Sequence, residues 1–167
     1  MKEALSPKAQ AYAERHGLRI GTPLGSGHHG SVFVVERNVK PNRSAFKVHK
    51  EQEPYSRERG VYERLTQREV VAIEGFAVPQ FLGADDDLLV LEMTIVEAPF
   101  IVDFASAYLD ERPEFPENVW EDWRQEKREE FGERWPVVED ILMTLRMQGV
   151  FLIDVHARNI AFLDEAE

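Results

Sequence analysis

The residues that decide the fold are Leu24-Gly25-Ser26-Gly27-His28-His29-Gly30-Ser31-Val32-Phe33-Val34-Val35. Their glycines follow the spacing G-x-G-x-x-G, which several unrelated phosphate-binding folds share. In a Rossmann turn or a P-loop these glycines open into a helix whose N-terminus faces the phosphates. Here the β-branched and aromatic residues after Gly30 predict a strand instead. The stretch is therefore expected to form a glycine-rich loop between two antiparallel strands, either a phosphate-covering flap or a plain flexible hairpin.

Composition limits what the chain can be. Its 167 residues include 31 acidic and 20 basic side chains, giving a formal charge of −11, and no cysteine. The length suits one domain, or one compact domain of two small lobes. The absence of cysteine excludes disulfides, thiolate nucleophiles and cysteine-bound metals. The negative charge argues against binding to nucleic acid or to an anionic membrane, because both are themselves negative.

Nothing in the sequence predicts a targeting or membrane segment. The apolar runs stay well short of the roughly 20 residues that span a bilayer. Met1–Gln10 lacks the basic and then apolar order of a signal peptide. We therefore expect a cytoplasmic protein.

Working outward from the glycine stretch, the pattern predicts a five-stranded antiparallel sheet. A short polar helix over Met1–His16 precedes it, and a second helix over Tyr55–Glu69 is inserted after the third strand. The expected strands are Leu18–Leu24, Ser31–Glu36, Ser44–Lys50, Phe81–Gly83 and Leu88–Met93.

From about Glu97 the apolar period becomes helical. Helices are expected over Ile101–Leu109, over Glu117–Trp135, and from Pro136 to Gly149. The second of these carries a stripe that we interpret as core: Trp120, Trp123, Lys127, Phe131 and Trp135. Two short strands, Val150–Ile153 and Ile160–Leu163, then flank a polar loop. Strands followed by helices predict an α+β fold with two segregated lobes, residues 1–95 and 96–167.

Lys47 lies in the third expected strand, beside the glycine loop. A lysine there can reach nucleotide phosphates as a point charge if a carboxylate holds it. Glu58 is the candidate partner, because it shares the inward face of its helix with Val61 and Leu65. A buried carboxylate is costly alone, so we expect an ion pair with Lys47. The alternative is an ordinary surface salt bridge between Glu58 and a neighbouring arginine.

The polar loop Asp154-Val155-His156-Ala157-Arg158-Asn159 could act as one chemical unit. The Asp154 carboxylate could orient an attacking hydroxyl, and the His156 imidazole could meet a transferring phosphate. The Asn159 amide oxygen could bind Mg²⁺. The alternative for this segment is a capping aspartate beside a solvated histidine.

In this order and at these distances, the three segments resemble the protein-kinase-like superfamily. The resemblance implies ATP and Mg²⁺ as cofactors, with Gly25, Gly27 and Gly30 over the phosphates. It makes Lys47 the ATP lysine, Glu58 its helix partner, Asp154 the catalytic base and Asn159 a metal ligand. His156 is what aminoglycoside and other small-molecule phosphotransferases have where protein kinases usually have lysine. An adenine slot would be lined by Val32, Ala45 and Ala161 and bonded by the backbones of Glu92 and Thr94.

The sequence departs from that family in two places. Leu152-Ile153 stand where His-Arg usually precedes the catalytic aspartate, so regulation by a phosphorylated activation loop is not expected. A metal-binding Asp-Phe-Gly is also missing after Asn159, which predicts a reduced helical C-lobe. Asp164 is the first candidate for the missing carboxylate, although four extended residues carry it roughly 13 Å or more from Asn159.

Three functions fit these residues. The first is a minimal ATP-dependent phosphotransferase acting on a hydroxyl acceptor. The second is a non-catalytic, nucleotide-binding pseudokinase that serves as an interaction module. The third is an α+β binding protein unrelated to kinases. A reduced C-lobe would also leave part of the Val138–Leu145 helix exposed, so a homodimer or a protein partner is expected.

Overall fold

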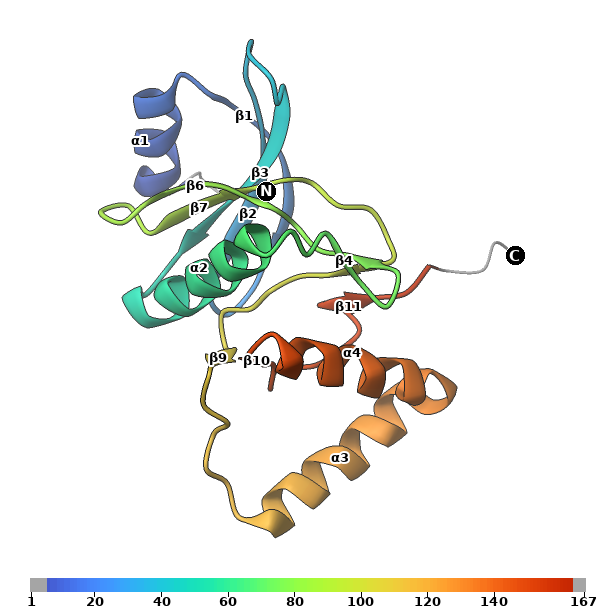
Figure 1. Cartoon of the computed structure of the whole chain (residues 1–167). Coiled ribbons are helices and arrows are strands. Elements are labelled where there is room, and N and C mark those ends of the chain that lie inside the picture. Colours follow the sequence, from blue (N-terminus) through green and yellow to red (C-terminus); the bar gives the residue numbers. More distant parts are fainter. Residues whose placement is uncertain (1–5, 164–167) are drawn as a thin grey trace.

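The computed structural model of the chain describes residues 6–163. Its main feature is a five-stranded sheet in the order β1-β2-β3-β7-β6, with every neighbouring pair antiparallel (Figure 1). This confirms the mixed α+β class and the five-stranded antiparallel sheet. The strands are β1 (Arg19–Ser26), β2 (Gly30–Glu36), β3 (Arg43–His49), β6 (Phe81–Asp85) and β7 (Val90–Met93).

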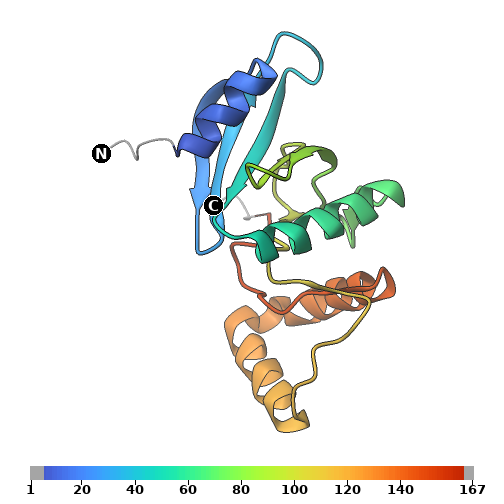
Figure 2. The same ribbon diagram turned by 90° about the vertical axis from the view of Figure 1, so that its left-hand side faces the viewer.

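Two helices cover the two faces of this sheet, α1 (Pro7–His16) and α2 (Gln52–Gln67) (Figure 2). Side chains alternate along β3, so Phe46 packs with α1 while Ala45 packs with α2. The Ser6 hydroxyl caps α1 by accepting from the Ala9 N–H at 3.2 Å. The face of β3 that carries Lys47 is therefore the face under α2.

A second sheet joins the two halves of the chain. Its order is β11-β8-β5-β4, with β5 and β8 parallel and the other pairs antiparallel. These strands are β4 (Ala72–Ile73), β5 (Phe76–Ala77), β8 (Phe100–Ile101) and β11 (Ile160–Ala161). They come from both sides of the expected boundary at residue 95, and one buried apolar cluster runs through both parts. The two expected lobes thus share a core.

The second half holds α3 (Glu117–Phe131), a short 3₁₀ turn η1 (Gly132–Arg134) and α4 (Trp135–Met147). Gly132 has φ +57° and ends α3, so this helix stops at Phe131 rather than at the expected Trp135, which instead begins α4. Helix α3 lies at the end of the molecule farthest from the five-stranded sheet (Figure 1 and Figure 2). No helix within residues 6–163 is both long and apolar enough to cross a membrane.

The expected apolar face of α4 is present but fully covered. Val138, Ile141, Leu142 and Leu145 are at most 4% exposed. The uncovered face that motivated a homodimer or protein partner is therefore absent at these residues, and the partner stays a prediction.

The expected helix over Ile101–Leu109 is wrong. The segment begins in β8, which pairs with β11, and ends in β9 (Tyr108–Leu109), which pairs with β10 (Val150–Phe151). Asp103 between them has φ +68°, which no α-helix tolerates. Pairing with strands about 50 residues away overrides the local helical period, because each backbone group finds its partner there.

Candidate active site

The glycine hairpin joins β1 to β2 as expected. Gly27 N–H donates to the Gly30 carbonyl at 2.9 Å and closes the turn. A Cβ added at Gly30 would lie 2.1 Å from the Val48 carbonyl oxygen, so the β2–β3 pairing itself requires glycine there. A Cβ at Gly25 or Gly27 would meet nothing within 4 Å. The first two glycines are thus not needed for packing, and their backbone is open to an approaching ligand.

Lys47 and Glu58 form the expected ion pair, with Nζ 2.7 Å from Oε1. Lys47 is 6% exposed and Glu58 is fully buried. Burial by itself would raise the pKa of Glu58, but the charge of Lys47 and the hydrogen bond from His49 outweigh it and lower the pKa to about 2. Burial would likewise lower the pKa of Lys47, yet Glu58 and Asp103 raise it. The surface salt bridge considered for Glu58 is therefore wrong.

Two members of this cluster were not expected from the sequence. His49 Nε2 lies 2.7 Å from Glu58 Oε1, and Asp103 Oδ1 accepts from Lys47 Nζ at 3.1 Å. The backbone N–H of Phe104, next to Asp103, donates to Glu58 Oε2 at 2.6 Å. Strand alternation could have revealed His49, which lies two residues after Lys47. No such signal points to Asp103, because the helical period of its segment predicts a helix there.

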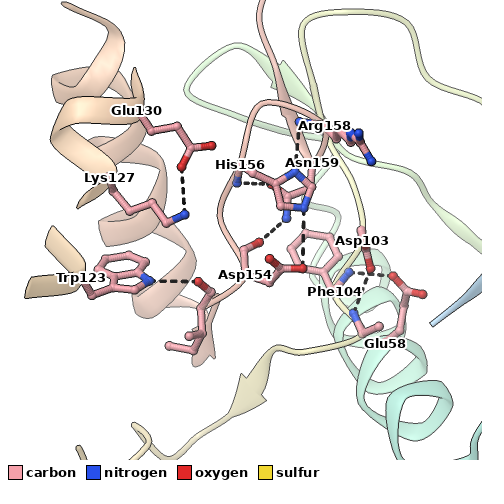
Figure 3. Close-up of polar contacts among 12 residues, drawn as sticks. Glu58, Asp103, Phe104, Trp123, Lys127, Glu130, Asp154, His156, Arg158 and Asn159 are labelled. Carbon is pink, nitrogen blue, oxygen red and sulfur yellow. Dashed lines mark hydrogen bonds and ion pairs between the residues drawn. The ribbon is translucent and has the colours of Figure 1, made fainter. Parts of the chain in front are cut away.

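The loop from Asp154 to Asn159 is held together by the buried amide of Asn159 (Figure 3). Asn159 Nδ2 donates to the Asp154 carbonyl, and Asn159 Oδ1 accepts from the His156 N–H at 2.9 Å. His156 Nε2 lies 3.6 Å from Asp154 Oδ2. The Asp154 carboxylate remains 45% exposed. This leaves Asp154 accessible and gives Asn159 a bracing role, with one oxygen lone pair still available.

The second sheet brings this loop next to the Lys47 cluster. The Val102 N–H donates to the Asn159 carbonyl at 2.8 Å, and Ile101 pairs with Ile160 in the β8–β11 ladder. Asp103 follows Val102 directly, so the residue that accepts from Lys47 Nζ is next in the chain to the residue that bonds the loop. Lys47, Glu58, Asp103 and the loop therefore occupy adjoining positions.

The expected adenine-binding edge is wrong at both residues. The Thr94 N–H donates to the Gln80 carbonyl at 3.0 Å, which closes the end of β7. The backbone of Glu92 lies inside the sheet, flanked by Phe46 of β3 and Gly83 of β6. Its buried side chain accepts from Ser44 Oγ at 2.6 Å and from Tyr12 Oη at 2.9 Å. Glu92 thus fastens α1 to the sheet.

The remaining adenine-slot residues lie near the site to different degrees. Val32 pairs with Lys47 across β2 and β3, so their side chains share one face. Ala45 lies in the core on that same face. Ala161 lies in β11, opposite Phe100. Asp164 lies outside the described residues.

The residues present fit a metal only together with a phosphate ligand. Within residues 6–163, no group of three or more histidine, aspartate or glutamate side chains could hold a metal ion. Mg²⁺ bound with a nucleotide needs only one or two carboxylates, because phosphates and waters complete its shell. Asp103 could supply such a carboxylate. Lys47 Nζ and the Ala105 N–H both donate to its Oδ1, and its side chain is 34% exposed.

Comparison with known proteins assigns the chain to no family. A scan against protein-family models and searches of curated proteins and of solved structures all found no match. The kinase-like resemblance therefore rests on the residues and geometry described above, and it stays a prediction.

Proposed function

We propose that the chain binds Mg²⁺–ATP under the glycine hairpin and transfers the γ-phosphoryl group to a hydroxyl acceptor. One observation carries the proposal. Lys47 Nζ is held by two carboxylates, Glu58 at 2.7 Å and Asp103 at 3.1 Å, where Asp103 adjoins the Asp154–Asn159 loop. Such a held lysine beside an open glycine hairpin suits recognition of phosphates.

Each residue has a defined role in this proposal. Lys47 contacts the phosphates, and Glu58, braced by His49 and by the Phe104 N–H, keeps its ammonium in place. Asp103 and the free lone pair of Asn159 Oδ1 hold Mg²⁺, which would neutralise charge on the β- and γ-phosphates. The exposed Asp154 carboxylate orients the acceptor hydroxyl and takes its proton.

Asp103 also answers the problem of the missing metal-binding carboxylate. The candidate that follows Asn159 in the sequence, Asp164, lies outside the described residues. Asp103 precedes the loop by about 50 residues in sequence but reaches it because β8 pairs with β11. The carboxylate can therefore be supplied by an earlier segment of the chain.

A second candidate function is nucleotide binding without transfer. The observation in its favour is that both polar atoms of the Asn159 amide already bond within the loop. If that bracing persists with nucleotide bound, the metal has one carboxylate from the chain and catalysis is weak.

Calorimetric titration with ATP, with and without Mg²⁺, tests the proposal. We expect binding that strengthens with Mg²⁺, and a loss of about tenfold in Asp103→Asn, which corresponds to about 1.4 kcal/mol. Lys47→Met should abolish binding, and Lys40→Met, the same change at an exposed site, should leave it unchanged. Because Lys47→Met leaves Glu58 buried with one partner fewer, circular dichroism must first show that this variant is folded.

The outcomes separate the candidate functions. No binding of Mg²⁺–ATP by the wild-type chain would overturn the proposal and favour an unrelated binding protein. Binding with equal ATP hydrolysis in wild type and Asp154→Ala would leave only the non-catalytic nucleotide binder. Loss of hydrolysis in Asp154→Ala with binding retained is the result expected of the phosphotransferase.

A further inference from the structure

A cavity of about 360 Å³ opens beside Asp154, on the side facing α3. Its walls come from α2, from the segment that includes β9, from α3 and from the residues that follow β10. In the close-up, Asp154 lies between Trp123 and Lys127 on one side and Asp103 on the other (Figure 3). The Asp154 carboxylate, which is proposed to act as the base, thus lines a cavity that is large enough for a small molecule.

Aromatic side chains form much of this cavity. Tyr108, Phe115 and Trp123 line it. Trp123 is fixed, because its indole Nε1 donates to the Ile153 carbonyl at 3.2 Å, next to Asp154. Phe115 is 44% exposed, although it is a large apolar side chain. Fixed and exposed aromatic faces beside a carboxylate suit a ligand with an apolar face and polar edges.

The cavity carries charged groups of both signs. Its lining residues include two cations, Arg57 and Lys127, and two carboxylates, Glu126 and Asp154. Both cations already have acidic partners, Glu53 at 2.5 Å from Arg57 and Glu130 at 2.9 Å from Lys127. With both cations paired, the lining carboxylates remain as hydrogen-bond acceptors, so the cavity disfavours an anionic ligand and suits a neutral one that donates through hydroxyl groups.

We propose that this cavity is the acceptor site and that it takes a neutral sugar ring, either free or in a nucleoside. This rests on the function proposed above. The C–H face of the ring stacks on Trp123 or Phe115, and its hydroxyls reach the carboxylates. One hydroxyl oxygen forms a bond to the γ-phosphorus of ATP as the bond from that phosphorus to the β–γ bridging oxygen breaks. ADP leaves, and Asp154 takes the hydroxyl proton.

Intrinsic tryptophan fluorescence tests this without ATP, because all three tryptophans lie in α3 and α4 and Trp123 lines the cavity. The probes are D-ribose, D-glucose and uridine, with a serine-containing peptide as a further arm. We expect a saturable change with at least one sugar-bearing probe. Phe115→Ala, at an exposed site, should weaken the affinity roughly fivefold or more. Met147→Ala, at an exposed site of α4 outside the cavity, is the matched control.

The results distinguish this inference from the proposed function. No response to any sugar-bearing probe, or a response to the peptide alone, would overturn the acceptor site even if Mg²⁺–ATP binds. A sugar response that Phe115→Ala leaves unchanged would overturn it as well. A sugar response lost in Phe115→Ala, together with absent ATP binding, would support the sugar site and overturn the phosphotransferase.

Discussion

At the scale of single residues, the centre of the molecule is a buried group of charges. Glu58 is fully buried, yet its two oxygens contact three donors: Lys47, His49 and the Phe104 N–H. Burying a carboxylate is costly unless it is paired and hydrogen-bonded. The full set of donors explains why Glu58 can lie in the core and remain charged.

The depressed pKa of Glu58 makes stability depend on pH. Because the pKa is about 2 in the folded chain against 4.5 for an ordinary glutamate, the stabilisation is complete above pH 4.5 and is lost as the pH falls towards 2. It amounts to about 3 kcal/mol in all. The free energy of unfolding, measured in urea between pH 5 and pH 2, should fall more steeply with pH for the wild type than for Glu58→Gln. Parallel curves for the two proteins would contradict this.

At the scale of elements, the hairpin between β1 and β2 has two kinds of glycine. Gly30 is required by the close approach of β3, whereas Gly25 and Gly27 face open space. None of these three has a positive φ, so the difference lies in the space around each Cβ position.

This difference predicts opposite results for two alanine substitutions. Gly30→Ala should destabilise the fold by about 2 kcal/mol or more, because its Cβ would meet the Val48 carbonyl. Gly27→Ala should leave the thermal midpoint nearly unchanged and weaken Mg²⁺–ATP binding, because the added methyl group obstructs approach to the backbone. Differential scanning calorimetry and ATP titration measure the two effects. If Gly27→Ala leaves ATP binding intact, the hairpin is a plain flexible loop.

The end of α4 is a second element that depends on one glycine. Gly149 has φ +77°, and a Cβ there would lie 2.6 Å from Asp110 Oδ1 and 2.7 Å from Arg64 Nη1. Those two atoms belong to the ion pair that links α2 to the segment after β9. Gly149→Ala should therefore lower the free energy of unfolding by about 2 kcal/mol, from backbone strain and displacement of this pair. Chemical denaturation measures it, and Gly75→Ala, also at positive φ but in open space, isolates the strain alone.

At the scale of the whole molecule, the second sheet and the common core make the two halves interdependent. Strands β5 and β8 pair across the boundary between them, and residues of both halves fill one apolar cluster. Because the two lobes share one core, unfolding one of them alone would expose core side chains of the other.

We therefore expect a single cooperative unfolding transition. Tryptophan fluorescence reports on α3 and α4, where all three tryptophans lie, and far-ultraviolet circular dichroism reports on the whole chain. The two signals should give coincident curves in urea. An earlier fluorescence transition would show that the helical half unfolds by itself.

Local periodicity was enough to predict the features that residues close together in the sequence form. The strands around the glycines, the α2 helix and the inward direction of Glu58 all follow from alternation or from a helical period. The Lys47–Glu58 pair followed too, because only one strand-to-helix connection separates the residues.

What only the tertiary structure decided depends on contacts between distant segments. Asp103 reaches the Asp154–Asn159 loop because β8 pairs with β11, and Thr94 loses its free N–H because Gln80 lies beside it. No local pattern encodes either contact, since each backbone group satisfies its hydrogen bond with a partner remote in sequence. The sequence by itself determined the sheet and the pair at its centre, and long-range strand pairing decided which acid lies beside the Asp154–Asn159 loop.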